Sequence, residues 1–297
     1  MPAKLIEGKP IAERIKEEIR QAVASLPKKP VLASVQVGEN AGAEAYARSQ
    51  KKTAENLGIE YQFHKLGQDT SEAALIEFIQ KLNRDTSVNG IIIQMPLPQQ
   101  IDYKKISTCI SPQKDVEGMH PANIGKIIFG TSATLSTDTE HSRGIGKAGI
   151  LPCTAAAVME LLNSCCPDLY GKEVVIVGHS EIVGKPLSLL LLDKFATVAV
   201  CHIGTSKAGK LEEHVRAAEV LIVAVGKAGL IKGDWIKEGA IVIDVGINRV
   251  GDKIVGDVEF EGASQRACCI TPVPGGVGPL TVTMLMRNVV EAAKLQG

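Results

Sequence analysis

The sequence has few aromatic residues, so its core must be aliphatic, and its lack of net charge and of a long apolar run each excludes a class of protein. Its 297 residues include 33 basic and 33 acidic side chains, so the basic surface that nucleic acid requires is not indicated. The longest apolar runs, such as the one that ends at Leu192, are too short to span a bilayer. Residues 1–9 carry charges and lack the apolar core of a secretory signal. We therefore expect a cytoplasmic protein with neither a nucleic-acid nor a membrane partner.

Cysteine is present, but in a pattern that suits neither cross-links nor metal. The seven cysteines are odd in number, and no two are spaced as a Cys-X-X-Cys pair. Neighbouring cysteines, at 165–166 and 268–269, point to opposite faces of a strand, which is a poor framework for a disulfide or a zinc ion. We expect reduced, inert thiols and no bound metal.

The length is about twice that of a usual single domain, which favours two domains or one large α/β domain. Hydrophobic periodicity predicts an α/β pattern in the first half. Its predicted elements are helix 10–25, strand 31–37, a helix from 42 that ends at Gly58, strand 62–66, helix 72–83 and strand 90–94. Gln94 then lies at the carboxyl end of a strand, where open α/β sheets place ligand-binding groups.

The second half alternates between helices and nearly continuous Val, Ile and Ala strands, which indicates a parallel sheet covered on both faces. Its predicted elements are helix 154–165, strand 173–178, helix 184–195, strand 197–202, helix 208–217, strands 219–225 and 240–245, and a last helix from 279. Between the halves, 130–149 is rich in Ser, Thr and Gly without apolar periodicity, so we expect an exposed loop. We place the domain junction just after it.

A glycine-rich turn follows the strand that ends at Gly178. Gly178 and Gly184 flank Ser180, and Pro186 suits the first turn of a helix. This is a relaxed dinucleotide fingerprint, in which glycine allows a tight turn and the helix N-terminus faces a phosphate. A glycine-bounded turn without a ligand is the alternative interpretation.

The end of the next strand normally selects between the two nicotinamide cofactors. An acidic residue there would bind a free ribose 2′-hydroxyl, and a cationic group would favour a 2′-phosphate. His179, His202 and Lys207 supply some positive character, whereas no acidic residue stands at this strand end. Each of them could equally be an ordinary loop residue.

Several segments together resemble one family, the bifunctional methylenetetrahydrofolate dehydrogenase/methenyltetrahydrofolate cyclohydrolases. The segments that carry the resemblance are 37–40 followed by Tyr46, then 94–98, 114–121, 152–154, 178–186 and 271–279. They cover essentially the whole chain in order, and the last of them is very specific.

The resemblance implies an α/β fold of two domains, a folate domain and a Rossmann-type parallel-sheet nucleotide domain, with a cleft between them and a homodimer as the assembly. The folate-binding catalytic domain would comprise 1–145 plus 279–297, and the NAD(P)-binding domain 146–278. The connection 128–150 is longer than the family usually has. We expect it to be disordered, with a lid or an interface insert as the alternative.

The resemblance also assigns roles to particular residues. The expected catalytic residues are Tyr46, Gln50, Gln94 and Glu117. The expected folate-binding residues are Tyr46, Gln94, Asp115, Glu117, Pro274, Gly275 and Gly276. The expected cofactor-binding residues are Gly178, His179, Ser180, Ile182, Val183, Gly184, His202, Thr205 and Ile247. The alternatives are structural: Tyr46 could be a core aromatic, and the Pro-Gly run only a rigid turn.

Two departures from the family concern the folate site. Gln50 stands where the family has a lysine, four residues after Tyr46 and so on the same helix face. Lys51 lies roughly 140° around the helix from Tyr46 and cannot simply take its place. Glu117 stands where the family has an aspartate, which keeps the carboxylate but adds a methylene group.

The chemistry decides what the loss of the lysine should do. Hydride transfer from 5,10-methylenetetrahydrofolate requires orientation but no proton transfer by a side chain. Hydrolysis of the methenyl product requires a group that titrates, which glutamine does not. We therefore predict a dehydrogenase whose cyclohydrolase activity is weak or lost, and a fully bifunctional enzyme that makes 10-formyltetrahydrofolate is the alternative. A catalytically inactive folate- or nucleotide-binding protein is the alternative of another class.

NADP is the cofactor that the resemblance implies. The family often has an arginine at the position of His179 and uses it near the cofactor phosphate. Because a histidine would weaken selection of the 2′-phosphate, NAD is a serious alternative.

Overall fold

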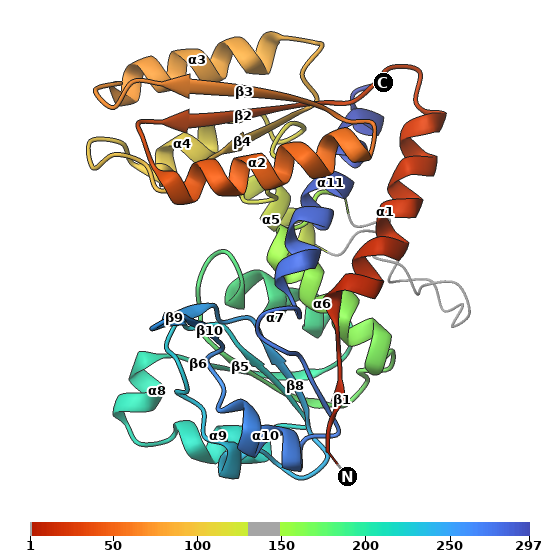
Figure 1. Cartoon of the computed structure of the whole chain (residues 1–297), viewed down its shortest axis with the longest axis vertical. Coiled ribbons are helices and arrows are strands. Elements are labelled where there is room, and N and C mark those ends of the chain that lie inside the picture. The colour runs from red at the N-terminus through yellow and green to blue at the C-terminus, as the bar shows by residue number, and fades with distance from the viewer. Residues whose placement is uncertain (1, 130–148) are drawn as a thin grey trace. The chain divides into compact units, whose positions relative to one another are not determined.

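A computed structural model describes residues 2–129 and 149–297, which form two compact units (Figure 1). Unit 1 comprises Met1–Glu13 and Thr154–Thr281, and unit 2 comprises Arg14–Cys153 and Val282–Gly297. Both are built of parallel strands and helices, which confirms the predicted α/β class.

Unit 2 contains a parallel sheet in the order β3-β2-β4, formed by Glu60–Leu66, Val31–Val37 and Gly90–Ile93. All of β2 is buried, and its alternate residues face opposite sides. Ala33, Val35 and Val37 pack in one apolar cluster with Leu75 and Ile79 of α3 (Glu72–Arg84). The other face carries Ser34, which contacts Gln94, and this is the side covered by α2 (Ala41–Asn56).

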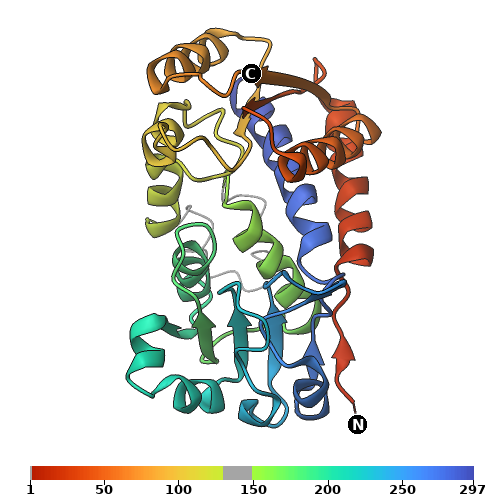
Figure 2. The same cartoon turned by 60° about the vertical axis from the view of Figure 1, so that its left-hand side comes forward.

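The remaining helices of unit 2 frame this sheet. They are the larger part of α1 (Gly8–Ser25), α4 (Tyr103–Cys109), α5 (Pro121–Ile128) and the part of α11 (Gly278–Leu295) from Val282 onward. Figure 2 shows that α1 and α11 run side by side although they lie at opposite ends of the sequence. Unit 2 is therefore assembled from discontinuous stretches of the chain.

Unit 1 contains a six-stranded parallel sheet in the order β1-β11-β8-β7-β5-β6. The strands are β1 Lys4–Leu5, β5 Glu173–Val177, β6 Thr197–Cys201, β7 Val220–Val223, β8 Ile241–Asp244 and β11 Cys269–Ile270. The helices that accompany these strands are α6 (Cys153–Cys165), α7 (Gly184–Leu192), α8 (Ile203–Lys207), α9 (Leu211–Ala217) and α10 (Phe260–Arg266). The unit also contains a short 3₁₀ turn, η2 (Gly233–Trp235), and a hairpin of β9 (Asn248–Val250) and β10 (Lys253–Val255). The strand order reverses between β5 and β7, and such a point is where doubly wound sheets bind ligands.

The structure differs from the predicted elements in several places. The predicted helix 208–217 begins only at Leu211, as α9, and Gly209, with φ +71°, separates it from a short helix α8 that was not predicted. The predicted elements do not include the short β1, α4, α5, α8, η2, β9, β10, α10 and β11. We expected a disordered connection at 128–150. Its residues 130–148 lie outside the described part of the chain.

Strand β1 places the N-terminus differently from the predicted domain bounds. Lys4 and Leu5 pair with Cys269 and Ile270, so they extend the sheet of unit 1. The predicted bounds had assigned 1–145 to the other domain. A strand of two residues gives no periodicity from which its partner could be inferred.

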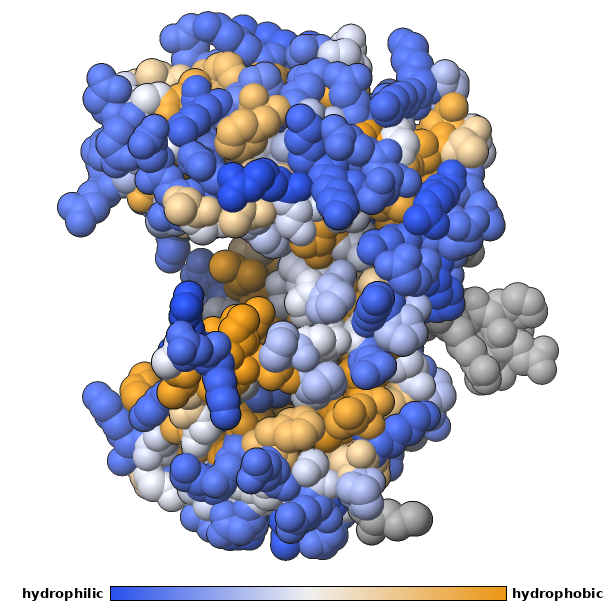
Figure 3. All heavy atoms as spheres, viewed as in Figure 1, coloured by the Kyte–Doolittle hydropathy of each residue, from blue (hydrophilic) through white to orange (hydrophobic). Residues whose placement is uncertain are grey.

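The surfaces of the two units differ in character. Figure 3 shows mostly hydrophilic side chains on the viewed face of unit 2 and a larger apolar share on that of unit 1. Among the exposed large hydrophobic residues of unit 1 are Ile182, Ile203 and Ile247. Within the two described stretches, no helix has the length and apolar character that crossing a membrane would require.

Asn288 of α11 is buried and joins three segments of unit 2. Its Nδ2 donates to the carbonyl oxygens of Val116 and Leu151, both at 2.8 Å. Replacing it by leucine leaves the Leu151 carbonyl without a donor and the Val116 carbonyl with only the Cys153 thiol, so we expect Asn288→Leu to lower the free energy of unfolding by about 1–3 kcal/mol. Urea unfolding followed by circular dichroism measures this, with Lys294→Ala on the exposed side as control. A loss below about 0.5 kcal/mol would contradict the role of this contact.

Candidate folate and dinucleotide sites

Four polar side chains from four segments meet inside unit 2, and we call Ser34, Gln50, Tyr61 and Gln94 the polar cluster. Gln94 Nε2 donates to Gln50 Oε1 at 2.7 Å and to Ser34 Oγ at 3.0 Å. The Tyr61 hydroxyl donates to Gln50 Oε1 at 2.9 Å. Gln50, Gln94 and Ser34 are all buried, so the cluster lies inside the unit, between α2 and the sheet.

Tyr46 and Gln50 share one face of α2, as their spacing predicts. Gln50 is fully buried, whereas Tyr46 is 42% exposed and lies where the cluster meets solvent. Burial raises the pKa of Tyr46 to about 12, and the nearby Gln50 side chain opposes that rise. Lys51 points elsewhere, because its Nζ lies 3.9 Å from Glu55 on the exposed side of the helix. The structure therefore gives Lys51 no part in this site.

The segment after α4 holds two carboxyl groups in different environments. Asp115 is buried, and its Oδ2 accepts from the His120 backbone N–H at 2.7 Å and from Asn123 Nδ2 at 2.9 Å. Glu117 is half-buried, and desolvation, reinforced by the charge of Asp115, raises its pKa to about 8. Glu117 therefore titrates near neutral pH, unlike an ordinary glutamate.

The charge of Glu117 affects three further groups. Its charge adds to the effect of burial in raising the pKa values of Tyr46, Tyr103 and Cys153. The predicted residues Tyr46, Gln50, Gln94, Asp115 and Glu117 all belong to unit 2, and the structure brings the first three into contact around the polar cluster.

Sequence analysis missed Ser34, Tyr61 and Tyr103. The available signal was Ser34 and Gln36, two polar residues at alternate positions of an otherwise apolar buried strand. No comparable local pattern marks Tyr61 or Tyr103.

The glycine turn lies at the carboxyl end of β5, beside the reversal of strand order. Gly178 adopts φ +125°, and a Cβ there would lie 2.3 Å from the carbonyl oxygen of Ala224. A Cβ at Gly184 would lie 2.0 Å from the carbonyl oxygen of Gly178, so both positions require glycine. The Ser180 hydroxyl accepts from the Val183 N–H at 3.1 Å, just before α7 begins. These residues fit a dinucleotide phosphate at the start of a helix.

The two histidines predicted near the cofactor are neighbours. The rings of His179 and His202 have centroids 5.2 Å apart. His202 Nδ1 accepts from the Gly204 N–H at 3.0 Å, and Thr205 Oγ1 accepts from the His202 N–H at 3.2 Å. Both imidazoles are exposed, as is Ile182, whereas Val183 is buried. The exposed groups border the turn, and Val183 packs beneath it.

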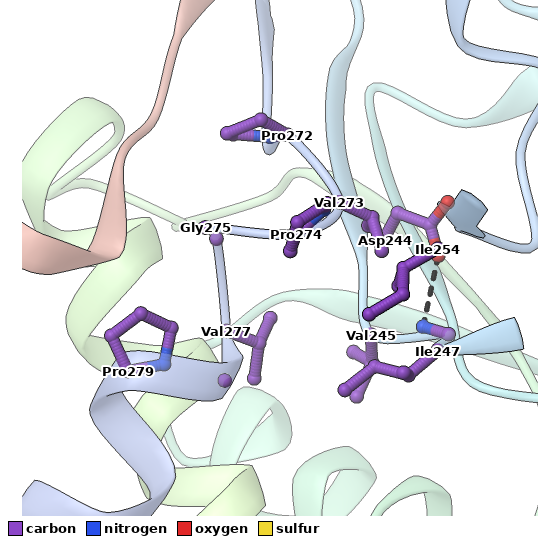
Figure 4. Close-up of a pocket in the computed structure, with 13 residues that line it drawn as sticks. Asp244, Val245, Ile247, Ile254, Pro272, Val273, Pro274, Gly275, Val277 and Pro279 are labelled. Atoms are coloured by element: carbon purple, nitrogen blue, oxygen red, sulfur yellow. Dashed lines mark hydrogen bonds between the residues drawn. The ribbon is translucent and has the colours of Figure 1, made fainter. Parts of the chain in front are cut away.

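A pocket of about 360 Å³ lies in unit 1 between the ends of β8 and β11 (Figure 4). Pro274, Gly275 and Gly276 line one side, and Ile247 and Ile254 line the other. Asp244 is buried at its base and accepts from the Gly246 N–H at 2.9 Å. Desolvation raises the pKa of Asp244 to about 6, against the lowering effect of three backbone donors. The predicted Pro-Gly residues thus meet the predicted cofactor-side residue Ile247.

Asp257 is a second buried carboxylate that sequence analysis missed. It accepts from the backbone N–H groups of Val225, Gly226 and Lys227 at 2.7–2.9 Å, and from Asn248 Nδ2 at 2.8 Å. It therefore ties the loop after β7 to the hairpin that begins at β9. In the described part of the chain, no three His, Cys, Asp or Glu side chains are grouped to hold a metal ion.

The fold and the glycine turn define the class of protein. Unit 1 is a Rossmann-type parallel sheet with a dinucleotide-binding turn at its switch point, and unit 2 is an α/β domain with a buried polar cluster. This architecture is typical of a two-domain NAD(P)-binding enzyme.

Comparison with known proteins then gives the family. Residues 6–117 match the family profile described as tetrahydrofolate dehydrogenase/cyclohydrolase, catalytic domain, and residues 152–297 match the NAD(P)-binding domain of the same family. The chain belongs to the tetrahydrofolate dehydrogenase/cyclohydrolase family and is one of its NAD(P)-dependent enzymes, which confirms the resemblance.

Individual relatives match along the whole chain. A bifunctional protein FolD of Pelobacter propionicus is 48% identical over 296 residues, covering 98% of each chain. The crystal structure of bifunctional FolD from Campylobacter jejuni has a TM-score of 0.90 at 41% identity, covering 99% of this chain and 100% of that one. The Trypanosoma brucei enzyme, complexed with NADP cofactor and inhibitor, has a TM-score of 0.87 at 35% identity, covering 99% and 98%.

The raised pKa of Glu117 makes stability depend on pH. Its pKa is about 8 in the folded protein and near 4.5 when unfolded, so the folded state retains a proton that the unfolded state releases between these values. Stability from this group is therefore full below about pH 4.5 and is lost as the pH rises through about 8. We expect Glu117→Gln to be more stable than the parent protein by ~1–3 kcal/mol near pH 9 and similar to it near pH 4.5.

Urea unfolding at both pH values checks this difference. Glu77→Gln is the matched control, because Glu77 is an exposed glutamate of α3 that pairs with Lys81. Equal effects of Glu117→Gln at the two pH values would show that Glu117 is not desolvated in the folded protein.

Proposed function

We propose that this protein oxidises 5,10-methylenetetrahydrofolate to 5,10-methenyltetrahydrofolate with NAD(P), in one-carbon metabolism. The strongest support is that this member of the family has two features together. One is the Gln50–Gln94 contact beside Tyr46, and the other is a glycine turn that fits a dinucleotide. In the proposed division of labour, the unit that contains Tyr46 binds the folate and the unit that contains Gly178 binds the cofactor.

The proposed roles follow from what each residue can offer. NAD(P), when bound, supplies the hydride acceptor. The glycine turn 178–184 would hold its phosphates, His179, His202 and Thr205 would face the adenosine ribose, and Ile247 would contact the nicotinamide half. Tyr46, Gln94, Asp115 and Glu117 would orient the folate, joined by the loop 274–276. No side chain needs to transfer a proton in this step, so orientation is the protein's contribution.

NADP is the proposed cofactor, with NAD as the alternative. The two neighbouring imidazoles offer hydrogen-bond donors to a 2′-phosphate, and no acidic side chain stands at the end of β6 to select a free hydroxyl. The NADP complex of the Trypanosoma brucei relative adds support.

Turnover tests the proposed function directly. Purified protein mixed with methylenetetrahydrofolate should reduce NADP, seen as a rise in reduced-nicotinamide absorbance, and NAD is measured beside it. Gln94→Leu removes two buried hydrogen bonds and should lower kcat/KM by about 10- to 100-fold. Gln113→Leu, on the exposed surface of the same unit, should change little. Folate binding without turnover with either cofactor would instead support a non-catalytic binding protein.

Cyclohydrolase activity is the second candidate function at the same site. The full-length relatives are named bifunctional, so the comparisons support a bifunctional enzyme better than loss of hydrolysis. Gln50 is the observation that argues against hydrolysis, because it lies within the polar cluster and its side chain cannot titrate.

Gln50→Lys separates the two interpretations. If Gln50 limits hydrolysis, the parent protein should hydrolyse methenyltetrahydrofolate near the spontaneous rate, and Gln50→Lys should raise the enzymatic rate at least ~10-fold by restoring a titratable group. Loss of methenyl absorbance follows the reaction. Lys51→Gln is the control, because Lys51 faces away. A parent rate well above the spontaneous rate would establish the bifunctional enzyme.

We also propose that the enzyme works in the cytoplasm as a homodimer. The support for the location is the cysteine pattern, since all seven thiols, every one in the described part of the chain, are free. The support for the dimer is the family resemblance alone.

A further inference from the structure

Tyr61 of β3 is joined to the polar cluster through one atom of Gln50. Its hydroxyl donates to Gln50 Oε1 at 2.9 Å, and Gln94 Nε2 donates to the same oxygen at 2.7 Å. An amide oxygen has two acceptor positions, so the protein itself occupies both. Gln94 is in turn fixed by Ser34, at 3.0 Å. The Gln50 amide is therefore held in one of its two possible orientations.

This orientation turns the amide nitrogen of Gln50 away from the cluster. Gln50 is fully buried, and no acceptor among the described residues forms a hydrogen bond with its Nε2. The Tyr46 hydroxyl lies beside this amide, because hydrogen bonding from the Gln50 side chain opposes the rise in the Tyr46 pKa. A buried N–H without a partner has lost its bonds to water without compensation, so a ligand that brings an acceptor to this point is favoured.

We propose that Tyr61 is a positioning residue, which holds the Gln50 amide so that its N–H donates to a carbonyl-type acceptor oxygen of the bound folate. This inference rests on the proposed function, since it names the contact that the folate makes at that site. Neither residue moves a proton. Burial raises the pKa of Tyr61 to about 12, so its hydroxyl remains a donor throughout the working pH range.

The chemistry of position 50 separates this role from simple packing. A lysine side chain has donors only, so the Tyr61 hydroxyl can accept from it but cannot donate to it, and no amide orientation remains to be selected. The effect of removing the Tyr61 hydroxyl should therefore depend on the residue at position 50. A packing role would give the same effect whichever residue stands there.

A double-mutant cycle of the full-length protein tests the proposal. The four proteins are the parent, Tyr61→Phe, Gln50→Lys and the double variant. Tyr61→Phe should raise the KM for methylenetetrahydrofolate about 5- to 10-fold, with kcat and the KM for the nicotinamide cofactor within about twofold. In the Gln50→Lys background the same change should alter the folate KM less than about twofold. Tyr170→Phe, on the exposed surface of unit 1, is the control.

Two results would overturn the inference: an equal rise of the folate KM in both backgrounds, which assigns Tyr61 to packing, or no rise in either. Calorimetric titration of the four proteins with methylenetetrahydrofolate gives the same comparison from Kd values. Because that measurement needs no turnover, a parent protein that binds but does not turn over would refute the proposed function while still deciding the role of Tyr61. Thermal unfolding of each variant verifies that it is folded.

Discussion

The hydrogen bond between Gln94 Nε2 and Gln50 Oε1 determines how α2 packs on the sheet of unit 2. The buried Gln50 oxygen is paired with Gln94, so this contact fixes where α2 lies on the sheet. Small residues, Ala43, Ala47 and Ala54, form the rest of the buried face of α2 and allow the helix to approach closely. The exposed Tyr46, one turn earlier, is thereby held at the solvent edge of the same face.

The dinucleotide unit relies on buried carboxylates in a similar way. Asp257 collects three successive backbone N–H groups after β7, and Asp244 accepts from Gly246, Asp257 and Val258. Gly246 and Gly256 are glycines because a Cβ at either would enter the neighbouring carboxylate. Charge-assisted hydrogen bonds, rather than apolar packing, thus fix two loops at the carboxyl ends of the sheet. Loops held in this way can present polar groups to a ligand.

The sequence predicts what depends on local pattern and misses what depends on distant partners. The apolar runs of β2 and β5 and the turn at Gly178 follow from their own residues, and Tyr46 and Gln50 share a helix face by spacing alone. Tyr61, by contrast, shows no sign in its own strand, since its role comes from a helix that precedes it by eleven positions. Asp257 binds a loop about thirty positions earlier, and nothing near it marks this. The domain bounds at the N-terminus failed for the same reason, because β1 is too short to carry a pattern.

Glutamine in place of the lysine that the family resemblance leads us to expect changes the proton chemistry of the polar cluster more than its hydrogen bonding. Gln50 still presents N–H groups beside Tyr46, held in place by Gln94 and Tyr61. Glu117, with its pKa at about 8, carries a proton over much of the neutral range and can donate where an ordinary carboxylate only accepts. The site is therefore rich in donors, which matches a folate rich in carbonyl acceptors. Under the proposed function, such a site would orient the folate for hydride transfer, and Glu117 would be the titratable group available for hydrolysis.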